Sequence, residues 1–214
     1  VALIKGPHGW GEFSPFLEYD DAEAAPWLAS AVEAASTPKP QLYRTSVAIN
    51  GTIPALNDPE ELKAIVDSFP GVKSFKVKVG SNLAEDLARV NVIRQLQPHA
   101  KIRIDVNGLW NVDQAEQFLT SVGEIEYVEQ PCATVDELRE LKSRTSVKIV
   151  GDEIVRKAGN PFDIDLTGAV DYLMLKVQPL GGIKRAHAIA EHHKLPVVVS
   201  SALESAVGIK YGLE

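Results

Sequence analysis

From about residue 45 onward, short apolar runs alternate with amphipathic stretches, and this alternation constrains the fold more than any other feature of the sequence. The candidate strands are 46–53, 75–79, 102–106, 126–129, 147–151, 172–177 and 196–200. The candidate helices between them are 59–68, 83–96, 112–121, 135–144, 161–166 and 183–192. Strands that alternate with helices are typical of parallel βαβ units, so the sequence predicts an α/β fold.

A polar residue stands at or near the C-terminal end of six successive candidate strands, at intervals of 23 to 27 residues. These residues are Lys78, Asp105, Glu129, Asp152, Lys176 and Ser200. In a closed (β/α) barrel the strand C-termini converge on one mouth, where active sites lie. In an open sheet the outer strands would be too far apart to share a site. The spacing therefore predicts a TIM-like barrel with an active site at its mouth.

Composition and charge exclude several other classes of protein. The formal net charge is −7 over 214 residues, and Lys and Arg are scattered, which argues against nucleic acid and anionic membranes as partners. Cys132 is the only cysteine, so no intrachain disulfide can form, and we expect a cytoplasmic location. No apolar run has the length of a membrane span, and no signal peptide is visible.

Three acidic residues end strands in the contexts IRIDVNG, YVEQP and IVGDE. These are Asp105, Glu129 and Asp152, and three carboxylates brought together would repel one another unless a cation lies between them. Oxygen ligands favour a hard divalent ion, Mg²⁺ or Mn²⁺. The alternative is that each acid separately caps a helix or pairs with a surface cation. Three matching positions in successive units favour the metal site.

The stretch FKVKVG places Lys76 and Lys78 on one face of a candidate strand, and LMLKVQP places Lys176 on a later one. A lysine near other cations is a better base than a free lysine. A base opposite a divalent ion suits removal of a proton α to a carboxylate, with the metal stabilising the enediolate. The alternative is an edge strand whose lysines oppose aggregation, which a closed barrel would exclude.

These motifs resemble a known family. KVK at 76–78, IDVNG at 104–108, EQP at 129–131, GDE at 151–153 and LKVQPLGG at 175–182 are similar to the muconate-lactonising subgroup of the enolase superfamily. Within that subgroup, GWGEFSPF at 9–16, VEQPCATVDEL at 128–138 and VVVSSALESAVG at 197–208 resemble the actinobacterial form of the o-succinylbenzoate synthase family. Each motif is weak alone, whereas the set is specific.

The resemblance implies a (β/α)7β barrel with a small α+β capping domain. Residues 1–40 would be part of that cap with its linker, and residues 41–214 would form the barrel. Barrels of this type take about 250 residues, and the sequence begins inside an apparent strand, VALIK. We therefore expect a longer parent protein, with further cap segments and the last barrel strand outside this sequence.

The implied reaction is the Mg²⁺-dependent dehydration of 2-succinyl-6-hydroxy-2,4-cyclohexadiene-1-carboxylate to 2-succinylbenzoate, a step of menaquinone synthesis. By this resemblance Lys78 is the general base, Lys176 stabilises the intermediate from the opposite face, and Lys76 positions the substrate carboxylate and makes Lys78 a better base. The implied metal ligands are Asp105, Glu129 and Asp152. The implied substrate-binding residues are Asn107, Gln130, Gly181, Gly182, Ser200 and Ser201.

Two other functions remain open at this point. An N-succinylamino acid racemase or a dipeptide epimerase needs the same two lysines and the same metal, so the catalytic residues do not separate these enzymes from the dehydratase. A protein of a different class, an inactive binding or scaffold protein, is disfavoured by the complete set of lysines and acids. The expected partner is a small-molecule carboxylate substrate, and the sequence leaves the oligomeric state undetermined.

Overall fold

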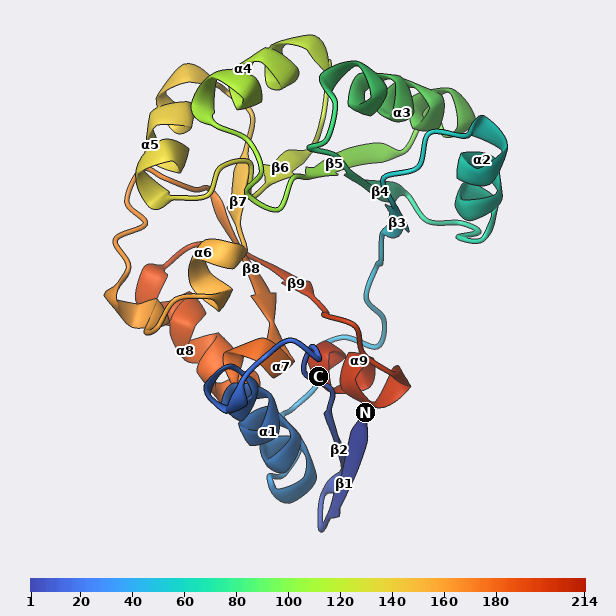
Figure 1. Cartoon of the computed structure of the whole chain (residues 1–214). Coiled ribbons are helices and arrows are strands. Elements are labelled where there is room, and N and C mark those ends of the chain that lie inside the picture. The colour runs from blue at the N-terminus through green and yellow to red at the C-terminus, as the bar shows by residue number, and fades with distance from the viewer. The chain divides into compact units, whose positions relative to one another are not determined.

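The computed structural model describes residues 1–214, which divide into two compact units that we describe one at a time (Figure 1). The sheet unit comprises Ala48–Lys157 and Asp165–Tyr172. The terminal unit comprises Val1–Val47, Ala158–Ile164 and Leu173–Glu214, so it joins the two ends of the sequence. This division by packing does not fix where a capping domain ends, and the predicted boundary near residue 40 stays a prediction.

The sheet unit contains five parallel strands, which pair in the order in which they occur in the sequence. They are β3 (Gly51–Ile53), β4 (Ser74–Lys78), β5 (Lys101–Asp105), β6 (Tyr127–Glu129) and β7 (Ile149–Gly151). The apolar residues of these strands are almost fully buried, Val77, Ile104 and Val128 among them. In β4 and β5 these apolar residues alternate with polar ones, whereas every residue of β6 and β7 is buried.

Four helices of the sheet unit lie on one side of these strands, as Figure 1 shows. They are α2 (Pro59–Asp67), α3 (Leu83–Leu96), α4 (Val112–Ser121) and α5 (Val135–Arg144); the short α6 (Glu153–Arg156) follows β7. Each of the four long helices begins at a side chain that accepts hydrogen bonds from backbone N–H groups of the first turn. These N-cap residues are Asp58, Asn82, Asn111 and Thr134.

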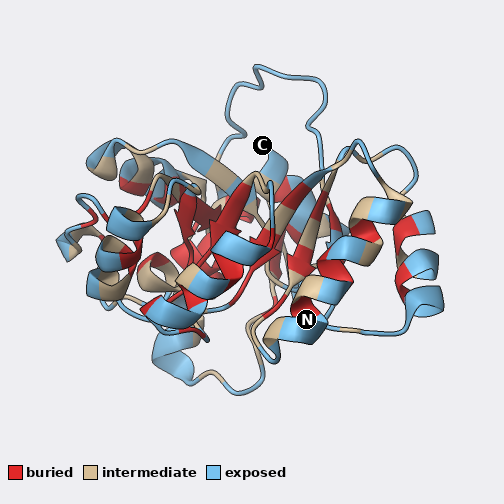
Figure 2. Ribbon diagram, turned by 90° about the horizontal axis from the view of Figure 1, so that it is seen from above, coloured by how far each residue is buried: buried red, intermediate tan, exposed pale blue.

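Each of these four long helices combines buried and exposed residues, as the colours in Figure 2 show. In the sheet unit the fully buried positions include Leu62 on α2, Ile93 on α3, Phe118 on α4 and Leu138 on α5. Burying one such side chain contributes about 1.5–3 kcal/mol relative to leaving it in water. The apolar faces of the helices therefore supply the packing energy that holds the strand ends in place.

In the terminal unit, β1 (Ala2–Gly6) and β2 (Gly9–Phe13) form an antiparallel hairpin that packs against α1 (Asp21–Ser36). Two glycines make the close approach possible. A Cβ atom would lie 2.3 Å from the Ala35 carbonyl oxygen at Gly6, and 1.9 Å from the Ala31 carbonyl oxygen at Gly11. Helix and hairpin could not meet at these points with any larger residue.

The rest of the terminal unit comes mainly from the C-terminal part of the sequence. The parallel strands β8 (Tyr172–Lys176) and β9 (Val197–Ser200) pair so that Lys176 lies opposite Ser200. The remaining elements are α7 (Val177–Leu180), α8 (Ile183–His193), α9 (Ala206–Leu213) and a single 3-10 turn, Pro161–Asp163. Ala34 of α1, Val177 of α7 and Tyr211 of α9 form a buried apolar cluster that ties the N-terminal segment to the C-terminal one.

Most predicted elements are present, with two corrections. The predicted strand 46–53 is shorter, because only Gly51–Ile53 pairs with a neighbour, and Val47 and Ile49 are exposed. The predicted helix 161–166 is only the 3-10 turn Pro161–Asp163, because the chain leaves helical geometry at Ile164. None of the helices combines the length and apolarity that a bilayer span requires.

Candidate active site

The strand register of the sheet unit places three of the predicted catalytic and metal-binding residues in one row. Lys78 at the end of β4 lies opposite Asp105 at the end of β5, and Asp105 lies opposite Glu129 at the end of β6. Adjacent strands are about 4.8 Å apart, so these side chains share one edge of the sheet. Lys76 precedes Lys78 by two residues and therefore lies on the same face.

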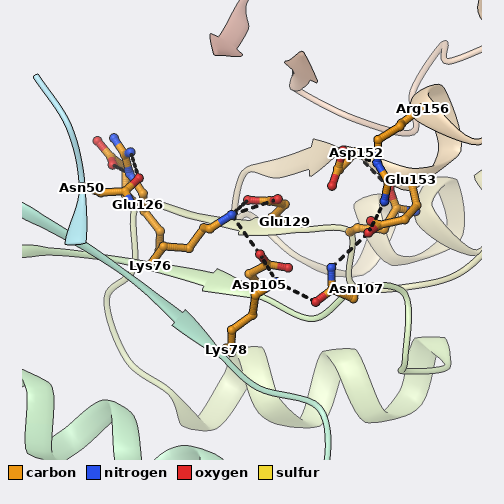
Figure 3. A network of polar contacts seen from close by, with 12 residues as sticks. Asn50, Lys76, Lys78, Asp105, Asn107, Glu126, Glu129, Asp152, Glu153 and Arg156 are labelled. Atoms are coloured by element: carbon orange, nitrogen blue, oxygen red, sulfur yellow. Dashed lines mark hydrogen bonds and ion pairs between the residues drawn. The ribbon is translucent and has the colours of Figure 1, made fainter. Parts of the chain in front are cut away.

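Figure 3 shows that these lysines point at the acids. Lys76 Nζ lies 2.9 Å from Asp105 Oδ2 and 3.2 Å from Glu129 Oε2. Lys78 Nζ lies 2.7 Å from the same Asp105 oxygen. The structure thus brings together four of the six residues predicted to carry catalysis and metal binding.

Burial makes these charges strongly dependent on one another. Asp105 and Glu129 are 1% and 0% exposed. Burial alone would raise the pKa of Asp105, but the charges of Lys76 and Lys78 outweigh it and hold that pKa below the ordinary value. Burial would likewise lower the pKa of Lys76, but Glu129 and Asp105 hold it above the ordinary value. At neutral pH Asp105 is therefore ionised and Lys76 is protonated.

The donor set of this edge fits a hard divalent cation at Asp105 and Glu129. The two carboxylates already share one cation, the Lys76 ammonium, and Asp105 Oδ1 is buried without a hydrogen-bond partner. No three acidic, His or Cys side chains lie close enough together to hold an ion. Asp152, at the N-cap of α6, is 0% exposed and lies 3.6 Å from Arg156. That Asp152 binds the metal together with Asp105 and Glu129 stays a prediction.

Asn107 connects Lys78 to a second group of polar residues (Figure 3). Its Oδ1 accepts a hydrogen bond from Lys78 Nζ at 2.7 Å, and its Nδ2 donates to Glu153 Oε1 at 3.0 Å. Arg156 also pairs with Glu153, at 3.2 Å. Asn107 has a left-handed backbone, φ 56°, which asparagine tolerates better than most residues. Asn107 therefore orients the Lys78 ammonium.

The side-chain amide of Gln130 forms hydrogen bonds with backbone groups. Its Oε1 accepts from the N–H of Asp152 at 2.9 Å and its Nε2 donates to the Cys132 carbonyl at 2.8 Å. The residue is fully buried and has a φ of 40°. In this structure Gln130 joins the ends of β6 and β7 and so places Asp152; its predicted contact with substrate stays untested.

A buried ion pair between Arg89 and Asp86 contacts the backbone of Lys78. The sequence did not predict this pair. Arg89 is 2% exposed and donates to the Lys78 carbonyl oxygen at 2.8 Å and to Asp86 at 2.7 Å. Asp86 accepts from the Gly80 N–H at 2.8 Å. The pair fixes the turn between β4 and α3. In the sequence the only signal is the i,i+3 spacing of the two charges within helix 83–96, which is equally typical of an exposed helix face.

The remaining predicted site residues lie in the terminal unit. Lys176 ends β8 directly opposite Ser200 on β9, and Ser200 and Ser201 are half-buried. Gly181 and Gly182 have φ values of 95° and 116°, which favour glycine. A Cβ at Gly182 would also lie 2.7 Å from the Glu33 carboxylate. These two glycines let the chain turn sharply between α7 and α8.

Cys132 is buried and does not act as a nucleophile in this arrangement. Burial raises the pKa of its thiol to about 12, so almost no thiolate is present at neutral pH. Cys132 is therefore a packed core thiol.

The βα repeat with lysines and acids at the strand ends is the architecture of enolase-type enzymes, and the chain belongs to that family. A family model described as "Enolase C-terminal domain-like" matches residues 60–214, and one described as "Enolase N-terminal domain-like" matches residues 1–35. The predicted α/β, enolase-like fold is thereby confirmed.

Curated relatives show which enolase-type proteins the chain is similar to. The chain is 51% identical over 219 residues to a protein of Mycobacterium ulcerans named o-succinylbenzoate synthase, and the match covers all of this chain and 66% of that protein. It is 49% identical to the protein of the same name from Mycolicibacterium smegmatis, of which 67% is covered. The chain therefore spans about two thirds of the length of the curated relatives it matches.

Solved structures share the fold at lower identity. An N-succinyl Arg/Lys racemase from Bacillus cereus matches with a TM-score of 0.70 and 27% identity, over 79% of this chain and 49% of that one. A dipeptide epimerase from Enterococcus faecalis, in complex with Mg and the dipeptide L-Leu-L-Tyr, matches with a TM-score of 0.68 and 25% identity, over 78% and 50%. The closer sequence relatives are thus synthases, whereas these structural neighbours are a racemase and an epimerase.

Proposed function

We propose that this chain is the larger part of an o-succinylbenzoate synthase. The enzyme would dehydrate 2-succinyl-6-hydroxy-2,4-cyclohexadiene-1-carboxylate to 2-succinylbenzoate, a step of menaquinone synthesis in the cytoplasm. The observation that carries the proposal is the row of Lys78, Asp105 and Glu129 on adjacent strand ends, with Lys76 shared between the two acids. Identity of about 50% to mycobacterial proteins of that name supports the choice of reaction.

Lys78 would carry the proton transfer. Its side chain is 34% exposed, against 12% for Lys76, so it is the lysine of this pair that a substrate can reach. Lys78 Nζ would take the proton at C1, α to the substrate carboxylate. The C6–O bond would then break, and the departing oxygen would leave as water after receiving a proton, which Lys78 can return. Hydrogen bonding to Asn107 would hold Nζ in line for both transfers.

Lys76 and Lys176 would act as fixed cations. Lys76, whose pKa is raised by Glu129 and Asp105, would stay protonated and position the substrate carboxylate. Lys176 would stabilise negative charge from the opposite face of the substrate. Asp105, Glu129 and Asp152 would hold Mg²⁺, with Mn²⁺ as a possible substitute. When bound, the cation would neutralise charge that develops on the substrate carboxylate.

One assay separates this proposal from its alternatives. The intact protein is incubated with the cyclohexadiene substrate and, separately, with N-succinyl amino acids and dipeptides, each with and without Mg²⁺. We expect Mg²⁺-dependent formation of 2-succinylbenzoate. Racemisation or epimerisation without dehydration would assign the chain to the racemase or epimerase class, and inactivity on all substrates would support a binding or scaffold protein.

A further inference from the structure

Glu12 is a buried carboxylate that the proposed chemistry does not use. It lies on β2 in the motif GWGEFSPF and is 2% exposed. Burying an ionised carboxylate costs several kcal/mol unless hydrogen bonds replace the lost water. The contacts of Glu12 must therefore offset the free-energy cost of its burial, and they indicate its role.

The hydrogen bonds to Glu12 come mostly from the start of α9, almost 200 residues further along the chain. Its Oε1 accepts from the Ser205 N–H at 2.9 Å and from the Ser14 hydroxyl at 2.8 Å. Its Oε2 accepts from the Gly208 N–H at 2.9 Å and from the Ser205 hydroxyl. The N–H groups of a first helical turn have no partner within the helix, and the helix dipole favours an anion there.

A glutamine could not make the same contacts. Both oxygens of Glu12 receive N–H and O–H donors, so an amide NH₂ group at either position would face donors. Burial alone would raise the pKa of Glu12, but hydrogen bonds from Ser205, Ser14 and Gly208 outweigh it and hold the pKa below the ordinary value. The site is thus built for the ionised form.

These contacts fix the segment that follows β9. The strand ends at Ser200, and only residues 201–204 separate it from Ser205, the N-cap of α9. On the neighbouring strand, Lys176 lies opposite Ser200, and Gln178 follows two residues later. The Ser14 hydroxyl donates to Gln178 Oε1 at 3.3 Å as well as to Glu12. Residues 12–14, at the end of β2 and just after it, therefore contact the segments that follow both β8 and β9.

We propose that Glu12 is a positioning residue, which fixes the loop 201–204 and with it the predicted substrate-binding residues Ser200 and Ser201. This inference rests on the proposed function, because the serines bind substrate only if the chain is the dehydratase or a related enzyme. Glu12 itself would not touch the substrate. Loss of the anchor would loosen substrate binding more than it slows the chemical step.

The first test measures the anchor without reference to activity. Hydrogen–deuterium exchange is compared between the intact parent protein, Glu12→Gln and the control Glu18→Gln, which removes the same charge at an exposed position of the same segment. We expect the amides of residues 201–208 to exchange at least tenfold faster in Glu12→Gln and unchanged in Glu18→Gln. Equal protection of this segment in all three proteins would overturn the proposal.

The second test measures the effect on the reaction. With Mg²⁺ present, Glu12→Gln should raise the KM for the cyclohexadiene substrate about tenfold and change kcat less than threefold, since the loss falls on substrate binding. Ser205→Ala, at an exposed position, removes one donor to Glu12 and should raise KM about threefold, which keeps the test decisive if Glu12→Gln does not fold. An unchanged KM in the folded variants would contradict the inference. If the parent protein does not dehydrate the substrate, the proposed function fails, and the exchange experiment alone decides the role of Glu12.

Discussion

The two units bury carboxylates in different ways. In the sheet unit, Asp105 and Glu129 meet the ammonium groups of Lys76 and Lys78. In the terminal unit, Glu12 meets backbone N–H groups and hydroxyls of Ser205, Gly208 and Ser14. Both sites offset the cost of burial, but the partners are long cationic side chains in the sheet unit and, at Glu12, backbone N–H groups together with two hydroxyls.

This difference separates reactive acids from structural ones. A lysine side chain can rotate away, so its place beside a carboxylate can be taken by a metal ion or by a substrate. A backbone N–H is fixed by the helix that contains it, so a carboxylate bound there stays bound. A buried carboxylate is thus a ligand candidate at the ends of β5 and β6 and an anchor on β2.

The largest effect is expected at the lysines of the sheet unit. Lys78→Ala should lower kcat for dehydration by about a thousandfold or more, because the proton-transfer group is lost. Circular dichroism and the unfolding midpoint should stay close to those of the parent protein. Lys73→Ala, an exposed lysine just before the same strand, is the matched control and should keep full activity. If Lys78→Ala retained more than a tenth of the parent rate, Lys78 would not be the base.

A change in the terminal unit that displaces β2 should affect stability instead. Gly11→Ala would place a Cβ 1.9 Å from the Ala31 carbonyl oxygen and push β2, which carries Glu12, away from α1. We expect a loss of about 3 kcal/mol in the free energy of unfolding, measured by urea denaturation. Gly159→Ala, in the same unit with open space around it, should change the value by less than about 0.5 kcal/mol. Equal stability of the two variants would show that the close packing of β2 on α1 is not required.

Asp171 combines both kinds of partner and should show an intermediate effect. It pairs with Lys142 and Lys148 and also accepts from the Ile149 N–H at 2.9 Å. Burial would raise its pKa, but these partners outweigh it and hold the pKa below the ordinary value of 3.8. The stabilisation is therefore complete above that value and is lost as the pH falls through the lowered pKa.

Asp171→Asn should accordingly lower the free energy of unfolding by about 1–2 kcal/mol at pH 7. The difference in the free energy of unfolding between the variant and the unmutated protein should decrease as the pH falls below about 4. Urea unfolding of both proteins at pH 7, 5 and 3 measures this difference. A gap that is the same at pH 3 as at pH 7 would mean that the charge of Asp171 contributes nothing.

The sequence predicted the strand-end residues because their period is a local signal. An apolar run followed by a charged residue every 23 to 27 positions requires no knowledge of distant contacts, and the register of Lys78, Asp105 and Glu129 follows from parallel pairing. Residues 46–50 were predicted wrongly for the same reason, since the apolar pattern alone does not show that no strand pairs with them.

The supporting residues could not be predicted because they depend on long-range contacts. Glu12 finds its partners 193 and 196 residues away. Arg89 and Asp86 look like a solvated pair within a helix, and only the folded chain shows that both are buried behind Lys78. Glu153 likewise follows a predicted metal ligand in the sequence, while its contact with Asn107 arises only in the fold.

The most direct test of the contrast between the two sites is a calorimetric Mg²⁺ titration of the intact parent protein, Glu129→Gln and Glu12→Gln. Our account predicts that the parent binds Mg²⁺, that Glu129→Gln weakens binding by about a hundredfold or more, and that Glu12→Gln stays within about threefold of the parent. Parent-like Mg²⁺ affinity in Glu129→Gln, or loss of binding in a folded Glu12→Gln, would contradict it.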